Sequence, residues 1–224
     1  MPPKNSLKEY KENTYYHIYN RGVAKGDIFK TVDDYKTFLG YLKLYLSLPK
    51  TLDLQGDSLK VAPSRQLKNH AETIKLMAYC LMPNHFHLFI FQKEEMSMNY
   101  FMRSLATKYS MYFNRKYKRV GPLFQGTYKA VEITSEEQYI YLSKYIHRNP
   151  TDLAPSGRLP EGFLEDYRYS SYANYLGLFK QSWVNTDEIL SYFSKINSRN
   201  SYKNFVEETD ESDIIRIKNV VLDI

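Results

Sequence analysis

The stretch 76–91 is almost entirely apolar, and two histidines follow a short Pro83-Asn84 link within it. Apolar runs of this length predict buried β-strands, and so short a link predicts that the two strands form a hairpin. Successive residues of a strand point to opposite faces, so His85 and His87 project side by side from one face. Because neutral imidazole binds divalent metals, the pair is either half of a metal site or two ordinary strand histidines.

The order of the predicted elements defines a fold class. Hydrophobic periodicity predicts strands at 15–19, 74–82, 85–91 and 127–133, and helices at about 33–45, 98–117 and 135–149. The order strand–helix–strand–strand–helix–strand predicts an α+β protein with a ferredoxin-like split βαβ core, an antiparallel sheet and helices on one face. The other face of the sheet then forms a platform for the two histidines, and a further helix is added to the core.

Composition limits the class of protein. Among 224 residues, 31 Lys and Arg against 25 Asp and Glu give a net charge of +6, which is compatible with a polyanion partner but is weak support alone. The single cysteine, Cys80, excludes an intramolecular disulfide framework and a zinc site made of several cysteines. No run approaches the roughly 18 apolar residues of a membrane span, and the N-terminus has no apolar signal core, so a cytoplasmic protein is expected.

The helix predicted at 135–149 carries the best partners for the two histidines. Tyr145 and Asn149 are four residues apart and therefore lie on one face of that helix. The Asn149 amide oxygen suits Mg²⁺ or Mn²⁺, and the Tyr145 phenol is a potential covalent nucleophile. From spacing alone, a core tyrosine is the more common reading, as we expect for the neighbouring Tyr139 and Tyr141.

Five blocks of sequence, in a fixed order, carry a family resemblance: 16–22, 78–88, 121–129, 145–150 and 169–172. Together they resemble the single-tyrosine transposases of the HUH endonuclease class, and most closely the REP-associated tyrosine transposases and their insertion-sequence relatives. The resemblance covers roughly residues 14–178, which we expect to form the nuclease domain, with an insertion loop at 50–70. Residues 179–224 are then a C-terminal extension.

The resemblance implies a complete catalytic site. His85, His87 and Asn149 match the metal ligands, with Asn149 the least specific match, and Tyr145 matches the nucleophile. The implied cofactor is Mg²⁺ or Mn²⁺. The implied reaction is cleavage and rejoining of single-stranded DNA at a REP-like or element-end hairpin, through a covalent 5′-phosphotyrosine intermediate. Members of the family act as monomers or as homodimers, and a nucleoid-associated location in the cytoplasm follows from the DNA partner.

Basic, polar and aromatic side chains in these blocks, and the basic cluster at 116–119 just before the third block, are candidates for DNA contacts, although a solvated surface is an equally good reading for the charged ones. The side chain of His17 is directed to the platform or to the core, depending on strand register. Two alternatives to the transposase reading are a non-catalytic protein that binds DNA or RNA hairpins on the same fold, and a metal-dependent phosphodiesterase that uses activated water. The candidate DNA-binding residues are Arg21, Lys116, Lys118, Arg119, Gln125, Tyr128 and Lys129.

Overall fold

The computed structural model describes residues 9–48, 69–154, 160–194 and 196–208. Four strands, β1 (Thr14–Arg21), β2 (Ile74–Met82), β3 (His85–Gln92) and β4 (Lys129–Glu132), form one sheet in the order β2-β3-β1-β4, with every neighbouring pair antiparallel. This order confirms the predicted ferredoxin-like α+β core. The predicted insertion at 50–70 lies almost wholly outside the described residues, as does the end of the chain from residue 209.

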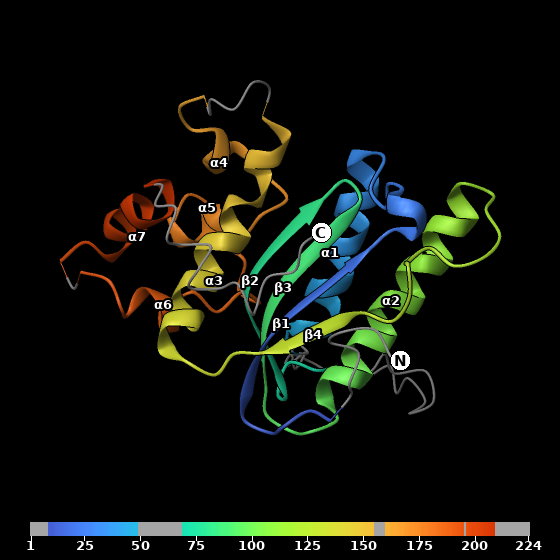
Figure 1. Cartoon of the computed structure of the whole chain (residues 1–224), viewed down its shortest axis with the longest axis horizontal. Coiled ribbons are helices and arrows are strands. Elements are labelled where there is room, and N and C mark those ends of the chain that lie inside the picture. Colours follow the sequence, from blue (N-terminus) through green and yellow to red (C-terminus); the bar gives the residue numbers. More distant parts are fainter. Residues whose placement is uncertain (1–8, 49–68, 155–159, 195, 209–224) are drawn as a thin grey trace, which may run out of the picture.

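Two helices cover one face of the sheet. Helix α1 (Val32–Leu46) follows β1, and helix α2 (Ser97–Lys116) follows β3 (Figure 1). Their buried side chains, among them Phe38, Leu42 and Phe101, pack against Ile18, Leu88 and other residues that β1, β2 and β3 direct to this face. A core of this kind is expected where the apolar stripes of two amphipathic helices meet the apolar face of a sheet.

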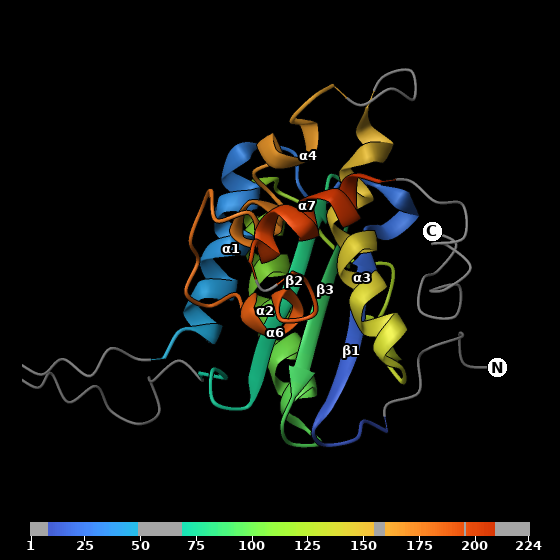
Figure 2. The same cartoon turned by 90° about the vertical axis from the view of Figure 1, so that its left-hand side faces the viewer.

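The opposite face of the sheet is also covered, so the expected platform is not open. Helix α3 (Glu136–Arg148) lies over β2 and β3, and α5 (Tyr172–Tyr175), α6 (Asp187–Leu190) and α7 (Ser198–Glu207) pack beside it on the same side of the sheet (Figure 2). These elements form a second core with the apolar side chains that β2 and β3 direct to this face, including Cys80, Met82 and Phe89. The sequence does not reveal this layer because the apolar residues of its short helices are too few to show a period.

Shorter elements complete the chain. A 3₁₀ turn, η1 (Val23–Lys25), follows β1, and a second, η3 (Asn149–Leu153), continues directly from α3. The short helix α4 (Phe163–Asp166) leads to α5. The turn after β1 requires glycine at position 22, because a Cβ there would lie 1.9 Å from the carbonyl oxygen of Gly26. In the described part of the chain no helix has the length and apolar character needed to cross a membrane.

The first turn of α1 is anchored by a buried carboxylate, Asp34. It accepts hydrogen bonds from the backbone N–H groups of Lys30 and Thr31, from the Tyr117 hydroxyl, and from the Lys116 ammonium at 2.7 Å. Burial raises the pKa of Asp34, but these donors lower it by more, to about 2. The ionised carboxylate therefore connects α1 to the C-terminal end of α2.

We expect Asp34→Asn to lower the free energy of unfolding by about 1–3 kcal/mol near neutral pH, because buried donors lose a charged acceptor. A depressed pKa contributes stability above the unfolded-state value and loses it as pH falls through the folded value. The difference between wild type and variant should therefore shrink as pH drops from about 4 to about 2. Urea unfolding across this range measures it, and a difference that does not change with pH would contradict the assignment.

Candidate active site

Strand register gathers the polar side chains of β1 and β3 on the face under α3. Tyr19 pairs with His87, and Arg21 pairs with His85, so these four side chains share one face with His17. Nε2 of His17 and Nδ1 of His87 are 2.9 Å apart and hydrogen-bonded, and the two rings are stacked with centroids 5.1 Å apart. His17, whose orientation could not be settled from the sequence, therefore belongs to the site.

The two histidines of β3 are oriented by different neighbours. Nδ1 of His85 hydrogen-bonds Oδ1 of Asn84 at 2.7 Å, whereas Nδ1 of His87 is engaged by His17. The ring centroids of His85 and His87 are 4.9 Å apart. Nε2 of His87 is buried, and it makes no hydrogen bond within the described residues. A buried ring nitrogen with its partner atom already engaged is the arrangement of a histidine prepared to ligate a metal.

Burial keeps both imidazoles of β3 neutral. Desolvation lowers the pKa of His85 to about 4, opposed by a hydrogen bond with Asn149 and assisted by the charge of Arg21. Desolvation also lowers the pKa of His87 far below its usual value, and the neighbouring His17 and His85 lower it further. Neutral imidazole is the form that binds metal ions.

Helix α3 brings Tyr145 over these histidines from the same chain. The helix begins after Ser135, whose hydroxyl accepts a hydrogen bond from the N–H of Gln138, as expected of an N-cap. The Tyr145 ring centroid lies 5.4 Å from that of His87 and 5.9 Å from that of His17. Burial raises the pKa of the Tyr145 hydroxyl, and a hydrogen bond with Asn149 opposes this effect.

Asn149 connects the tyrosine to the histidines. It caps the C-terminal end of α3, is buried, and donates from Nδ2 to the backbone carbonyl of Tyr145 at 2.9 Å. Hydrogen bonding by its side chain also raises the pKa of His85 and lowers that of Tyr145, so Asn149 acts on both groups. The predicted spacing of four residues therefore does place Tyr145 and Asn149 together, next to His85.

The residues present offer both nitrogen and oxygen ligands for a divalent cation. Within the described residues, no three His, Cys, Asp or Glu side chains are grouped as a metal site; the Asn149 amide oxygen could add a neutral ligand to the imidazoles. The buried Nε2 of His87 supplies one donor with no other partner in that part of the chain. Two histidines and one neutral oxygen leave positions for water and for a substrate oxygen.

The candidate DNA-binding residues occupy three kinds of place. Arg21 and Lys129 belong to the site face, because Lys129 pairs with Tyr19 across β1 and β4. Lys118 and Gln125 are exposed on the connection between α2 and β4, and Arg119 lies over the Phe113 ring there.

In contrast, Lys116 is ion-paired with Asp34, and Tyr128 is buried. Tyr128 stacks on Tyr10 and donates to Oδ1 of Asn99 at 2.8 Å.

Other aromatic and titratable residues near α3 have structural contacts. Tyr139 is buried against Tyr15 and Phe89, and His147 hydrogen-bonds Tyr202 and Ser171. Asp152 in η3 was missed by the sequence analysis: its charge raises the pKa of Tyr145, and only the turn at the end of α3 brings it there. Strand alternation puts His17 on the same face as Tyr19, but only the pairing of β1 with β3 shows that this is the face of His87.

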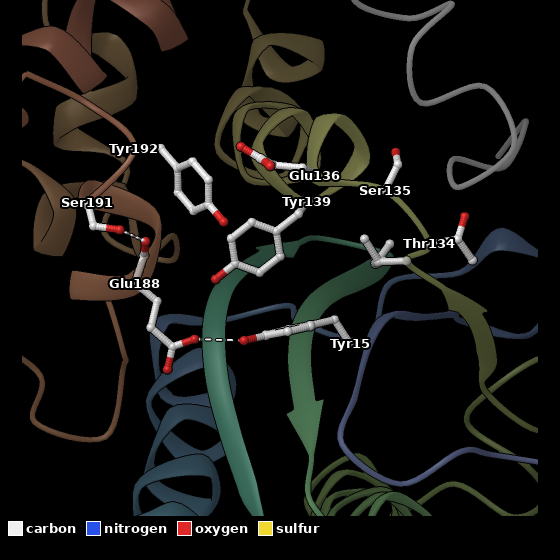
Figure 3. Close-up of a pocket in the computed structure, with 9 residues that line it drawn as sticks. Tyr15, Thr134, Ser135, Glu136, Tyr139, Glu188, Ser191 and Tyr192 are labelled. Carbon is white, nitrogen blue, oxygen red and sulfur yellow. Dashed lines mark hydrogen bonds between the residues drawn. The ribbon is translucent and has the colours of Figure 1, made fainter.

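A hollow at the N-terminal end of α3 is separate from this site. Tyr15, Tyr139 and Tyr192 line it together with Glu188 (Figure 3). The Tyr15 hydroxyl donates to one oxygen of Glu188 at 2.7 Å, and the Lys75 ammonium donates to the other at 2.7 Å. Because the Glu188 carboxylate is already paired in this way, the hollow offers little to a ligand.

Comparison with known protein families finds a match in the middle of the chain. Residues 60–149 match the family model described as "Transposase IS200 like". The match confirms the resemblance to the single-tyrosine transposases of the HUH class, and it spans β2, β3, α2, β4 and α3 with His85, His87, Tyr145 and Asn149. No curated protein sequence matches the chain.

Among the solved structures that the chain matches is that of a REP-associated tyrosine transposase bound to a REP hairpin. The similarity covers 80% of this chain and 90% of that chain, with 13% sequence identity and a TM-score of 0.49.

Proposed function

We propose that this protein is a metal-dependent endonuclease and strand transferase for single-stranded DNA that carries hairpins, with Tyr145 as its nucleophile. One observation carries the proposal. A tyrosine on α3 lies against a buried histidine whose Nε2 has no hydrogen-bond partner among the described residues, and an asparagine contacts both the tyrosine and the second histidine. The match to the IS200-like transposases supports the same reading.

The proposed chemistry at Tyr145 is a transesterification. Its Oη attacks the scissile phosphorus, so an O–P bond to the tyrosine forms and the P–O3′ bond breaks. The phenol proton is released, and the departing 3′ oxygen takes up a proton. Attack by a second 3′ hydroxyl on the phosphotyrosine reverses these changes and joins a new strand. The bond energy is kept in the phosphodiester throughout, so no external energy source is required.

His85, His87 and Asn149 are the proposed ligands of Mg²⁺ or Mn²⁺. When bound, such an ion polarises the scissile phosphate and neutralises charge that develops on it. The protein contributes the orientation of its own groups: Asn84 and His17 fix the two imidazoles, and Asn149 fixes the phenol relative to His85. Arg21 and Lys129, on the same face, are suited to hold neighbouring phosphates.

A covalent adduct tests the nucleophile. The wild-type protein, incubated with Mn²⁺ and a single-stranded hairpin oligonucleotide, should form a protein–DNA species that survives denaturation. Tyr145→Phe should form none, because its ring has no hydroxyl to attack phosphorus. Tyr141→Phe is the matched control: it changes a tyrosine on the same helix and should leave adduct formation near the wild-type level.

Other outcomes of this experiment point to other functions. Cleavage without an adduct that persists in Tyr145→Phe would favour a phosphodiesterase that uses activated water. Binding of hairpins without cleavage by the wild type, in the presence of Mn²⁺, would favour a non-catalytic hairpin-binding protein. Either result contradicts the proposed mechanism.

His17 should affect metal affinity without touching the metal. Nε2 of His87 presents a lone pair only when the Nδ1–H of His87 donates to His17, so the contact selects the ligating tautomer. We expect His17→Phe to weaken Mn²⁺ binding about 10–100-fold, the usual effect of removing such a partner. His17→Gln retains an acceptor and should bind more tightly than His17→Phe. Titration calorimetry measures both, and equal affinity in all three proteins would contradict this role.

Salt dependence tests the phosphate contacts. On single-stranded DNA, log K falls with log salt with a slope of about −0.7 per phosphate contact, so each lost contact makes the slope about 0.7 less steep. Arg21→Gln and Lys129→Gln should each reduce the slope by about that amount. Lys116→Gln should leave the slope unchanged and lower protein stability instead, because its ammonium is paired with Asp34. Fluorescence anisotropy over a salt series distinguishes these outcomes, and unchanged slopes for Arg21→Gln and Lys129→Gln would remove both residues from the DNA site.

A further inference from the structure

Helix α7 packs along the face of α3 that is turned away from the sheet (Figure 2). Tyr202 and Val206 of α7 are fully buried, and Phe205 contacts the Tyr141 ring with centroids 5.1 Å apart. Helix α3 is thus enclosed between the sheet on one side and α7 on the other. The position of α3 therefore sets where the backbone of Tyr145 lies relative to the sheet.

Buried hydrogen bonds connect α7 to α3 through His147. The Tyr202 hydroxyl hydrogen-bonds Nδ1 of His147 at 2.7 Å and Oγ of Ser143 at 3.1 Å. Nε2 of His147 hydrogen-bonds Oγ of Ser171, 2.7 Å away, and the N–H of Tyr79 in β2 donates to the same Oγ. This chain joins α7, α3, the start of α5 and the sheet. Because such bonds are directional, they fix the rotation of α3 more strictly than apolar contacts do.

Two cations of α3 add to the contact. The guanidinium of Arg148 donates to the backbone carbonyl oxygens of Val206 and Glu207, at 2.8 and 3.4 Å. These carbonyls belong to the last turn of α7, which has no further helical N–H groups to satisfy them and which attracts positive charge. The Lys144 ammonium lies over the Phe205 ring at 4.8 Å. Lys144 directly precedes Tyr145 in the sequence, and Arg148 follows it by three residues.

We propose that α7 is a strap that fixes α3, and with it Tyr145, over the histidines of the same chain, with Tyr202 and Arg148 as positioning residues for the nucleophile. The role of positioning a nucleophile rests on the proposed function. The packing of α7 on α3 does not depend on it. It assigns a use to the C-terminal segment beyond the predicted nuclease domain. A segment that served only to enlarge the core would not require a buried hydrogen-bond chain or a guanidinium on the end of α7.

Cys80 offers a local probe of the strap. It is the single cysteine of the chain and is fully buried. It lies on β2 under the layer that α3 forms with α5, α6 and α7, here called the α3 layer. Burial also raises the pKa of its thiol, so the native protein should react slowly with a thiol reagent such as DTNB. Reaction requires either movement of the α3 layer or global unfolding, and urea unfolding of the same protein separates the two.

Tyr202→Phe and Arg148→Leu should each raise the rate of Cys80 labelling about tenfold beyond the change that global stability accounts for. Arg148→Lys, which retains a donor for the carbonyls, should restore most of the protection. Leu42→Ala is the control for global destabilisation, since Leu42 is buried on the opposite face of the sheet. Lys203→Ala is the control on α7 itself, because Lys203 pairs with Glu165 rather than with α3.

The same variants should slow adduct formation at saturating DNA while hairpin affinity stays near wild type, because the strap positions the nucleophile and not the DNA. If Cys80 labelling in Tyr202→Phe and Arg148→Leu changes only in proportion to global stability, as in Leu42→Ala, α7 does not fix the position of α3 and the proposal is wrong. The labelling measurement judges the strap even if the wild type forms no adduct, an outcome that would contradict the proposed function alone.

Discussion

The antiparallel register of β1 and β3 is the constraint on which the site depends. It sets Tyr19 opposite His87 and Arg21 opposite His85, and brings His17 within 2.9 Å of the His87 ring. A slip of one residue would send the β1 side chains to the face covered by α1 and α2. The same register directs Ile18 into the first core, so the packing that stabilises the sheet also assembles the site.

The helices and strands whose apolar residues recur at regular spacing could be predicted from the sequence. The strands, the hairpin, the two long helices and the sheet order follow from apolar spacing and turn residues, and the spacing of Tyr145 and Asn149 already placed them on one helix face. The direction of the His85 and His87 side chains follows from strand alternation. These features are set by local geometry, which the order of residues specifies.

The features that depend on packing between distant segments could not be predicted. The short helices α5 and α6 carry too few apolar residues to show a period, so the second layer on the sheet was missed. Lys116 was a candidate for phosphate contact, but the crossing of α1 and α2 brings it to Asp34. Tyr128 was a candidate for base stacking, and the structure buries it beside Tyr10. Side-chain partners across 80 or more residues are decided by tertiary structure.

Tyr145 of α3 lies over His87 of the same chain, so one chain is expected to complete the site. An equal mixture of Tyr145→Phe and His87→Ala proteins tests it most directly, since each variant lacks a different part of the site. With Mn²⁺ and a hairpin oligonucleotide, wild-type protein should form the covalent DNA adduct and the mixture should form none. Adduct formation by the mixture would show that the tyrosine of one chain acts with the histidines of another, which contradicts the account.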